Sequence, residues 1–446
     1  MDASQEPKFG LGRRDISSRH LLAKALVIGL CTGAIGTAFR LALKEAETWR
    51  THIAPRFPGP IGFILAIAVG AATGAVAVWL VARFAPEASG SGIPHLKAVV
   101  RGTAELRWRR VLPVKFFSGL LGIGGGMALG REGPTIQMGG ATGLMVAGWF
   151  KVTPGEGERK ALVSAGAAAG LAAAFNAPLA AMMFVLEELH GEITPIVFVA
   201  SFLASVTADV VVRILVGGAP VFPIHGLVAP ALSALPAAAV AGLLAGLVGV
   251  GFNRSVLESV AAFSRWKTLP RAAAGALVGA ACGLAGWFVP GLAGTGTSLV
   301  ERALAGGFKA GVIPLLLVIR WFLTVAGYGS GPAGGIFLPL LVIGALGGLG
   351  FGGLAHDLFP VWIPHPEVFA VIGMGALFTA IVRAPLTGLV LMIELTGVYD
   401  FMLPLLVSCL CAYWIAQSTG NLPLYEALRI VKFGRETTRG ADPLTP

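Results

Sequence analysis

Arg131 and Glu132 stand side by side between two long apolar runs, 111–129 and 135–150. Ionisable groups at membrane depth are costly to bury, so such groups mark functional sites. The glycines on either side of the pair let the backbone come close to another group. Pro134 suits the first turn of a helix, where its missing N–H loses nothing. The stretch therefore predicts a break in the membrane-embedded chain, followed by a helix start.

A helix that starts at this break would offer an anion site. Helix starts present N–H groups without intrahelical partners and a partial positive charge. Glu132 would place a carboxylate where a dissolved anion could bind, so that the two compete for one site. For Arg131 we favour a structural role, paired or hydrogen-bonded nearby, because a bare guanidinium would hold an anion too tightly to release it.

The composition is that of a polytopic membrane protein. Of the 446 residues, 55% are hydrophobic and 13% are charged, and the mean hydropathy is +0.80. These values exclude an ordinary soluble domain. The 63 glycines suit the close packing of membrane helices. The polar N-terminus has no short apolar core followed by a cleavage site, so we expect no signal peptide.

We attribute the net charge of +10 to the orientation of the protein in the membrane rather than to nucleic-acid binding. Basic residues gather in the two tails and in short loops, which predicts cytoplasmic termini by the positive-inside rule. The four cysteines and seven histidines show no ligand spacing, so we expect no metal. The basic clusters are Lys8/Arg13/Arg14, Arg107/Arg109/Arg110, Arg265/Lys267/Arg271 and Arg429/Lys432/Arg435.

Many of the apolar segments are too short or too broken for a simple bundle, which would show runs of about 20 apolar residues. Segments interrupted by Gly or Pro must be tilted or re-entrant, and broken backbone is tolerated only inside protein or around a cavity. The segments lie near 21–43, 61–84, 111–129, 134–150, 160–174, 177–189, 196–216, 230–252, 271–289, 311–327, 339–355, 368–381, 384–396 and 401–418.

The chain repeats itself at a nearly constant offset. Broken segments at corresponding places in two halves indicate a transporter site between repeats. We expect repeats over 21–220 and 225–431, between cytoplasmic tails at 1–20 and 432–446, without a regulatory domain; the sequence leaves open whether the repeats are inverted or parallel. The matches are Pro86/Gly90/Gly92 with Pro290/Gly294/Gly296, Gly130/Glu132/Pro134 with Gly335/Phe337/Pro339, and Ala177/Pro178/Glu187 with Ala384/Pro385/Glu394, at offsets of 204, 205 and 207.

The repeat also sorts the carboxylates. Glu187 has a counterpart in Glu394, which indicates a shared structural or helix-end role. Glu132 and Glu188 align with apolar residues, so these two acids break the symmetry. Two separated acids suit a proton route with an outer and an inner station. An intramembrane enzyme that uses Glu187 and Glu188 as acid and base is disfavoured, because adjacent helical residues point about 100° apart.

The same motifs resemble those of the CLC family of chloride channels and proton-coupled chloride transporters. Residues 90–94 (GSGIP), 130–134 (GREGP) and 335–339 (GIFLP) resemble its signature motifs, and residues 166–188 and 423–425 resemble its bacterial members. The resemblance implies an all-α homodimer of tilted, broken and re-entrant helices, built from two inverted repeats with one pore per subunit. It also implies the inner membrane of a bacterium, with lipid, chloride and protons as partners and no cofactor.

The resemblance assigns roles to single residues. The hydroxyls of Ser91 and Tyr425 and the backbone N–H groups of Ile336 and Phe337 would bind the central chloride. Glu132 would be the outer gate and Glu188 the inner proton acceptor, an acid that the channel branch typically lacks. The resemblance therefore implies a chloride/proton exchanger, with a passive voltage- or proton-gated chloride channel as the alternative. Supporting residues are Gly90, Gly92, Pro94, Arg131, Gly133, Gly335 and Glu187.

Overall fold

The computed structural model is all-helical over the residues that it describes, 15–53, 56–57, 59–153, 157–224, 230–265 and 270–434. Residues 1–14 and 435–446, most of the two predicted tails, lie outside this range. The helices of the first half are α1 (Asp15–Ile53), α2 (Pro60–Phe84), α3 (Ile93–Val100), α4 (Trp108–Gly124), α5 (Glu132–Trp149), α6 (Gly157–Phe175), α7 (Pro178–Phe184) and α8 (Pro195–Val216).

The second half repeats this order and adds one helix. Its helices are α9 (Leu235–Arg265), α10 (Arg271–Phe288), α11 (Thr297–Leu304), α12 (Ile313–Ser330), α13 (Phe337–Leu358), α14 (Val368–Val382), α15 (Pro385–Thr396), α16 (Met402–Ser418) and α17 (Leu424–Phe433). Short helical segments lie between them: η2 (Pro86–Ala88), η3 (Val185–His190), η4 (Leu232–Ala234), η5 (Pro290–Leu292) and η6 (Ala310–Val312).

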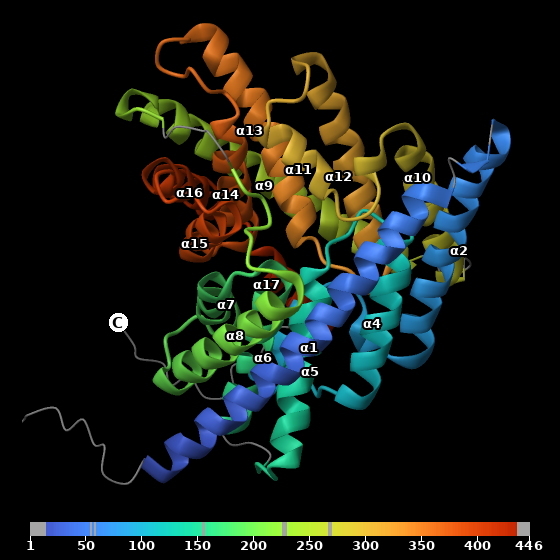
Figure 1. Cartoon of the computed structure of the whole chain (residues 1–446), viewed down its shortest axis with the longest axis vertical. Coiled ribbons are helices and arrows are strands. Elements are labelled where there is room, and N and C mark those ends of the chain that lie inside the picture. Colours follow the sequence, from blue (N-terminus) through green and yellow to red (C-terminus); the bar gives the residue numbers. More distant parts are fainter. Residues whose placement is uncertain are drawn as a thin grey trace, which may run out of the picture.

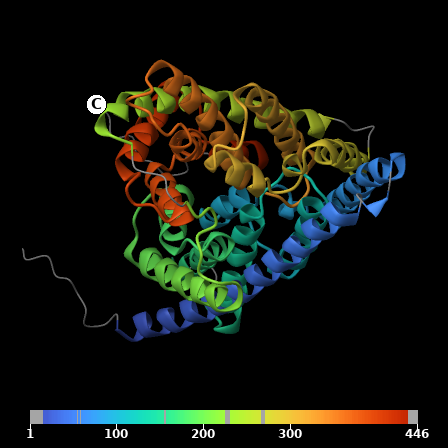
Figure 2. The same ribbon diagram turned by 45° about the horizontal axis from the view of Figure 1, so that its top comes forward.

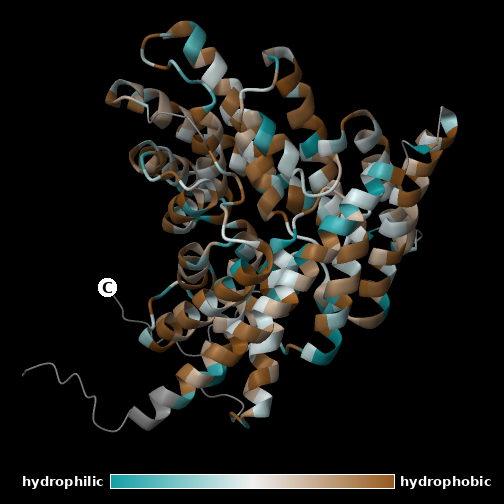
Figure 3. Ribbon diagram, viewed as in Figure 1, coloured by the Kyte–Doolittle hydropathy of each residue, from teal (hydrophilic) through white to brown (hydrophobic). Residues whose placement is uncertain are grey.

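Helix lengths follow the broken pattern of the sequence. Among the described residues, seven helices are long and apolar enough to cross a membrane, and three further apolar helices are shorter. The helices α3, α7 and α11 have only 8, 7 and 8 residues. Hydrophobic residues dominate the helices, as the brown colour in Figure 3 shows. The short elements α3, α11 and α17, of 8, 8 and 10 residues, are too short to stand out as membrane segments in the sequence.

The two halves pack in the same way and occupy different parts of the molecule. The pair α5–α6 corresponds to α13–α14, and the group α1–α6–α8 corresponds to α9–α14–α16. The elements α1–α8, blue to green, fill one side of Figure 1, and α9–α16, yellow-green to red, fill the other; the view in Figure 2 agrees. Close glycine contacts recur as well, since Gly139 faces Gly166 in the first half and Gly344 faces Gly373 in the second.

Backbone pairing shows that the halves are inverted. Gly130 and its counterpart Gly335 exchange both N–H···O=C bonds at 2.7 Å, in an antiparallel bridge. Equivalent segments that pair antiparallel run in opposite directions. This settles the alternative that the sequence left open, in favour of inverted repeats.

Two glutamates fasten the halves together reciprocally. The Glu187 carboxylate accepts the N–H groups of Leu386 and Thr387 at the start of α15, at 3.2 and 2.7 Å. The Glu394 carboxylate accepts the N–H groups of Leu179 and Ala180 at the start of α7, at 3.1 and 2.7 Å. Each carboxylate therefore caps the facing helix start, where unpaired N–H groups and the helix dipole favour negative charge.

Two buried cations also correspond, at an offset of 205. Lys115 on α4 is completely buried, and its Nζ donates to the carbonyls of Ala88 and Gly90 at 2.9 and 2.6 Å. Arg320, equally buried on α12, donates to the carbonyls of Leu292 and Thr295 at 2.9 and 2.8 Å. Each cation holds the loop in front of a short helix, α3 or α11. Buried cations need such hydrogen bonds to offset their lost hydration. Of the Arg320 donors, Nε has no hydrogen-bond partner among the described residues.

Candidate functional site

The three motif loops meet where the halves join. Gly90 donates its N–H to the Pro332 carbonyl at 2.9 Å, and Gly334 donates to the Gly90 carbonyl at 3.1 Å. Together with the Gly130–Gly335 bridge, these bonds tie the starts of α3, α5 and α13 into one block. Gly90 and Gly92 both have positive φ, at 70° and 81°, which glycine adopts without strain. The predicted supporting glycines thus shape the block, and Pro94 lies in the first turn of α3.

Glu132 is the first residue of α5 and is completely buried. Its Oε2 accepts the backbone N–H of Leu338 at 3.3 Å, in the first turn of α13. Its Oε1 has no hydrogen-bond partner among the described residues. A carboxylate therefore lies at a helix start of the opposite half, in the kind of position that favours anions. A Cβ added to Gly130 would collide with Oε2, so glycine at this position leaves room for the carboxylate.

Ser91 and Tyr425 approach the same region from different ends of the chain. Ser91, fully buried, lies against Gly133, and its Oγ is 3.3 Å from the Tyr328 hydroxyl. Tyr425, also fully buried, is close enough to Tyr328 and Glu132 for electrostatic interaction. Its hydroxyl has no hydrogen-bond partner among the described residues. A buried hydroxyl donor without a partner suits an anion, because an unsatisfied donor is otherwise costly.

Ile336 and Phe337 supply the start of α13 and are completely buried. N–H groups in this first turn have no partner within the helix. The Phe337 ring packs against Phe175, Phe184 and Phe378, with centroid distances of 5.4, 6.0 and 4.6 Å. The aromatic cluster packs around the helix start, where the Leu338 N–H meets the Glu132 carboxylate.

Arg131 lies beside Glu132 at the start of α5. It is the residue before α5, and its Nε has no hydrogen-bond partner among the described residues. Arg40 lies nearby and bonds Asn176 at 2.7 Å instead. The charge of Arg131 lies close enough to Glu132 for electrostatic interaction. The structural role expected for Arg131, paired or hydrogen-bonded nearby, stays a prediction.

Glu188 and Glu187 diverge, as the helical spacing predicted. Both lie on η3, a π-helical segment in which Gly191 donates its N–H to the Leu186 carbonyl at 2.9 Å, five residues back. Glu187 points to α15, whereas Glu188 is 5% exposed and accepts a bond from Lys97 Nζ at 2.7 Å. Single π-helical turns are common at functional sites. The two acids therefore cannot serve one substrate as an acid and base pair.

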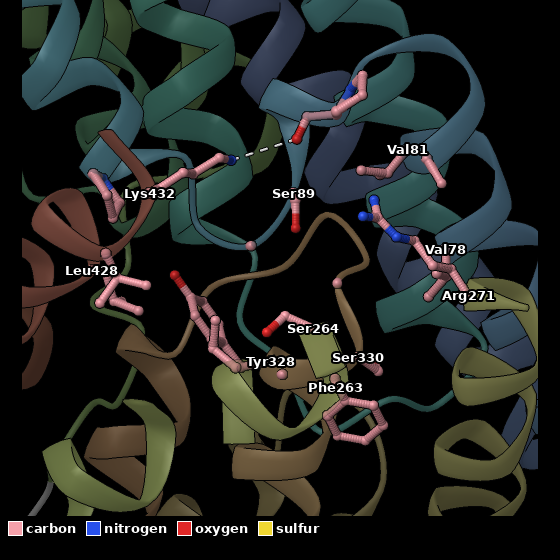
Figure 4. Close-up of a pocket in the computed structure, with 18 of the residues that line it drawn as sticks. Val78, Val81, Ser89, Phe263, Ser264, Arg271, Tyr328, Ser330, Leu428 and Lys432 are labelled. Atoms are coloured by element: carbon pink, nitrogen blue, oxygen red, sulfur yellow. Dashed lines mark hydrogen bonds between the residues drawn. The ribbon is translucent and has the colours of Figure 1, made fainter. Parts of the chain in front are cut away.

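A cavity of about 410 Å³ opens beside the Ser91 loop. It reaches Gly90, Gly92 and Tyr328, and two cations, Arg271 and Lys432, also line it. Figure 4 shows these cations on opposite sides of the cavity, with Lys432 bonded to the Pro86 carbonyl. No acidic residue is among those that line it. The cavity can therefore attract anions towards the loop that carries Ser91.

Two residues of the site were not predicted. Tyr328 was missed because a tyrosine near the end of an apolar run reads as an interfacial residue. Lys97 was missed because its partner Glu188 lies 91 positions away. A signal existed for Lys97, since it lies three residues after Pro94 on the short helix that follows Ser91. A lysine on so apolar a helix needs a partner.

Comparison with known proteins places this arrangement in a family. The model of the voltage gated chloride channel family matches residues 73–417. The H(+)/Cl(-) exchange transporter ClcA of Vibrio cholerae is 41% identical over 443 residues, which cover 97% of this chain and 94% of that protein. The ClcA of Salmonella typhimurium is 38% identical over 97% of this chain and 93% of its own.

Solved structures agree with the fold. A slow cyanobacterial Cl-/H+ antiporter superposes with a TM-score of 0.88 at 36% identity, covering 93% of this chain and 98% of that one. A eukaryotic CLC transporter, with a TM-score of 0.80 at 24% identity over 94% of this chain and 75% of its own, shares the fold. The arrangement is that of an integral membrane protein for ion transport. The chain belongs to the CLC family, as its motifs predicted.

Proposed function

We propose that this protein is an antiporter that exchanges chloride for protons across the membrane. One observation carries the proposal: the buried Glu132 carboxylate accepts an N–H at the start of α13, where an anion would bind. A chloride ion and this carboxylate compete for the same donors. When chloride arrives, like charges disfavour the ionised carboxylate, so the side chain takes up a proton and releases the donors. The relatives named as chloride/proton exchangers support this function over a passive channel.

We assign the central chloride to the hydroxyls of Ser91 and Tyr425 and to the N–H groups of Ile336 and Phe337. None of these donors carries a full charge. Helix dipoles and hydroxyls hold an anion gently, each contributing on the order of 1 kcal/mol or less, and transport needs binding that also releases. The partnerless Tyr425 hydroxyl supports this assignment. No resident cofactor has a role in the proposal.

We assign Glu132 to the outer proton station and Glu188 to the inner one. The basic clusters near Arg107, Arg271 and Arg429 would then face the cytoplasm, in keeping with the positive-inside rule. The cavity lined by Arg271 and Lys432 would be the cytoplasmic chloride entrance. The membrane would be the inner membrane of a bacterium, with both termini on the cytoplasmic side. Two subunits would associate, each with its own pathway.

Proton flux in liposomes tests the proposal. A chloride gradient should drive protons uphill through the wild-type protein, and Glu188→Gln should abolish that proton flux while chloride still passes. Glu132→Gln should remove the gate as well, so that chloride flux no longer depends on pH. Chloride flux in the wild type without any coupled proton movement would instead establish the channel alternative.

A further inference from the structure

Lys97 lies between two carboxylates that come from different parts of the chain. Its Nζ is 2.7 Å from Glu188 Oε1 and 3.3 Å from Glu426 Oε2. The Lys97 side chain is only 7% exposed, and the two carboxylates are 5% and 18% exposed. An ammonium group that is buried away from water needs a carboxylate partner to remain charged. Because both carboxylates are close, Lys97 can change partner by a small side-chain movement.

The helices that carry these groups also carry the chloride ligands. Lys97 is on α3, which begins two residues after Ser91. Glu426 is on α17, directly after Tyr425. The two helices pack against each other, and α3 also packs against η3, which carries Glu188. A change in the Lys97 partner would therefore act on both helices that hold the proposed chloride site.

Glu426 is a permanent anion beside this lysine. Burial would raise its pKa, but bonds from Arg429 and Arg101 and the charge of Lys97 outweigh burial and hold the pKa at about 2. Arg101 donates at 3.0 Å and Arg429 at 2.8 Å, both to Oε1, while Oε2 faces Lys97. Glu426 therefore remains available to Lys97 whenever Glu188 becomes neutral.

Tyr425 on α17 is close enough to Glu188 for electrostatic interaction, and its hydroxyl has no hydrogen-bond partner among the described residues. The charged groups and the histidine near Glu188 have partners of their own. On η3 itself, Glu187 caps α15, and His190 bonds Ser164 on α6 at 2.7 Å. Arg101, the residue directly after α3, contacts Glu426 and also acts on Glu188 through its charge. Lys97 bonds Glu188 directly, and Glu426 is a second acceptor within its reach.

We propose that Lys97 is a positioning residue that moves between Glu188 and Glu426 as Glu188 gains and loses a proton. With Glu188 ionised, Lys97 bonds it at close range. When Glu188 takes a proton, its oxygen attracts the ammonium less, and Lys97 moves to Glu426. This movement transmits the proton state of Glu188 to α3 and α17. The proposal rests on the function proposed above, in which Glu188 is the inner proton station.

Two substitutions should shift the pH dependence in opposite directions. Lys97→Met removes the cation that favours ionised Glu188, so the midpoint of proton flux against cytoplasmic-side pH should rise by about one unit. Glu426→Gln leaves Lys97 with Glu188 as its only carboxylate and removes a like charge, so the midpoint should fall. Lys97→Arg keeps the charge and should restore a midpoint near that of the wild type. The measurement is proton flux in oriented liposomes over a pH series.

A matched control is Glu158→Gln. Glu158 also bonds a buried lysine, Lys24 at 2.6 Å, but does not lie in α3, α17 or η3. It should leave the midpoint unchanged. The proposal for Lys97 is overturned if the midpoints of Lys97→Met and Glu426→Gln stay at the wild-type value or move in the same direction. This holds even if Glu188→Gln abolishes proton flux, a result that would support the exchanger function. Proton flux that survives Glu188→Gln would overturn the proposed function itself. If Lys97→Met does not fold, Lys97→Gln tests the same charge.

Discussion

At the scale of single residues, the site depends on glycines that leave space for functional side chains. Gly130 is the clearest case, because any Cβ at this position would collide with the Glu132 carboxylate. The sequence marked Gly130 as part of a motif and Glu132 as a costly buried acid. It could not show that the carboxylate of one half reaches a backbone N–H of the other, because the contact joins positions 206 residues apart.

Gly130→Ala should expel the Glu132 carboxylate from the start of α13. The displaced side chain no longer competes with chloride, so chloride flux should become less dependent on pH and coupling should weaken. Chloride flux measured from pH 4 to 8 in liposomes checks this. Gly148→Ala is the control, since nothing lies within 4 Å of a Cβ at that position and its φ lies outside the left-handed region. Unchanged coupling in Gly130→Ala would show that the carboxylate is not held where the structure places it.

Lys115→Met should weaken chloride binding. The substitution keeps the side-chain volume but leaves the Ala88 carbonyl without its donor, at a cost of about 1–3 kcal/mol. The Gly90 carbonyl keeps only the bond from the Gly334 N–H. Because these carbonyls fix the loop that carries Ser91, chloride affinity should fall severalfold in calorimetric titration.

Arg320→Met is the matched control for this prediction. It removes the equivalent donors from the loop before α11, which carries none of the proposed chloride ligands. Stability should fall by a similar amount while chloride affinity is retained. Equal losses of chloride affinity in both variants would mean that general loosening, rather than the Ser91 loop, is responsible.

At the scale of elements, the reciprocal caps are the main joint between α7 and α15. Glu187→Gln and Glu394→Gln should each destabilise the protein by about 1–3 kcal/mol, because an amide oxygen without charge faces two N–H donors and its NH₂ group accepts nothing. Thermal unfolding in detergent measures the loss. Glu258→Gln, in an exposed ion pair with Arg254 on α9, should change stability by about 0.5 kcal/mol or less. If the cap variants lose no more stability than this control, the reciprocal caps do not hold α7 and α15 together.

The sequence predicted most elements but not all of them. Apolar runs such as 61–84 and 196–216 coincide with α2 and α8, because a membrane helix needs a long apolar stretch. The short helices α3, α11 and α17 were not predicted, because a helix of 8 or 10 residues leaves little periodic signal in the sequence. These short helices lie beside the motif loops, so their motifs, rather than their hydropathy, revealed the site.

At the scale of the whole molecule, acid should weaken the joint between α17 and α3. A carboxyl whose pKa is depressed stabilises the fold above its ordinary value of 4.5 and loses that contribution as pH falls. For Glu426 the loss should extend from about pH 4.5 down to about 2. Acid unfolding followed by tryptophan fluorescence should therefore show wild type losing its advantage over Glu426→Gln in this window. A stability difference that stays constant with pH would contradict the pairing.

The cavity makes a second prediction at this scale. Lys432→Glu places an acid opposite Arg271 and should lower the rate of chloride flux severalfold, with the effect shrinking at high ionic strength because the added charge is screened. Stopped-flow chloride flux at two salt concentrations checks it. A rate that does not depend on the charge at position 432 would remove this cavity from the chloride pathway.

The antiparallel meeting of Gly130 and Gly335 has a consequence for direction. A molecule made of two identical inverted halves would be unable to tell the two faces of a bilayer apart. Here the phenyl ring of Phe337, which packs against other aromatic rings, occupies the position at which the other half carries the ionisable carboxylate of Glu132. This difference is one of those that make the two faces of the molecule distinct, together with Glu188 and the additional helix α17. In vesicles that hold the protein in both orientations, the two directions of transport would be averaged, and the difference between the two faces would not be seen.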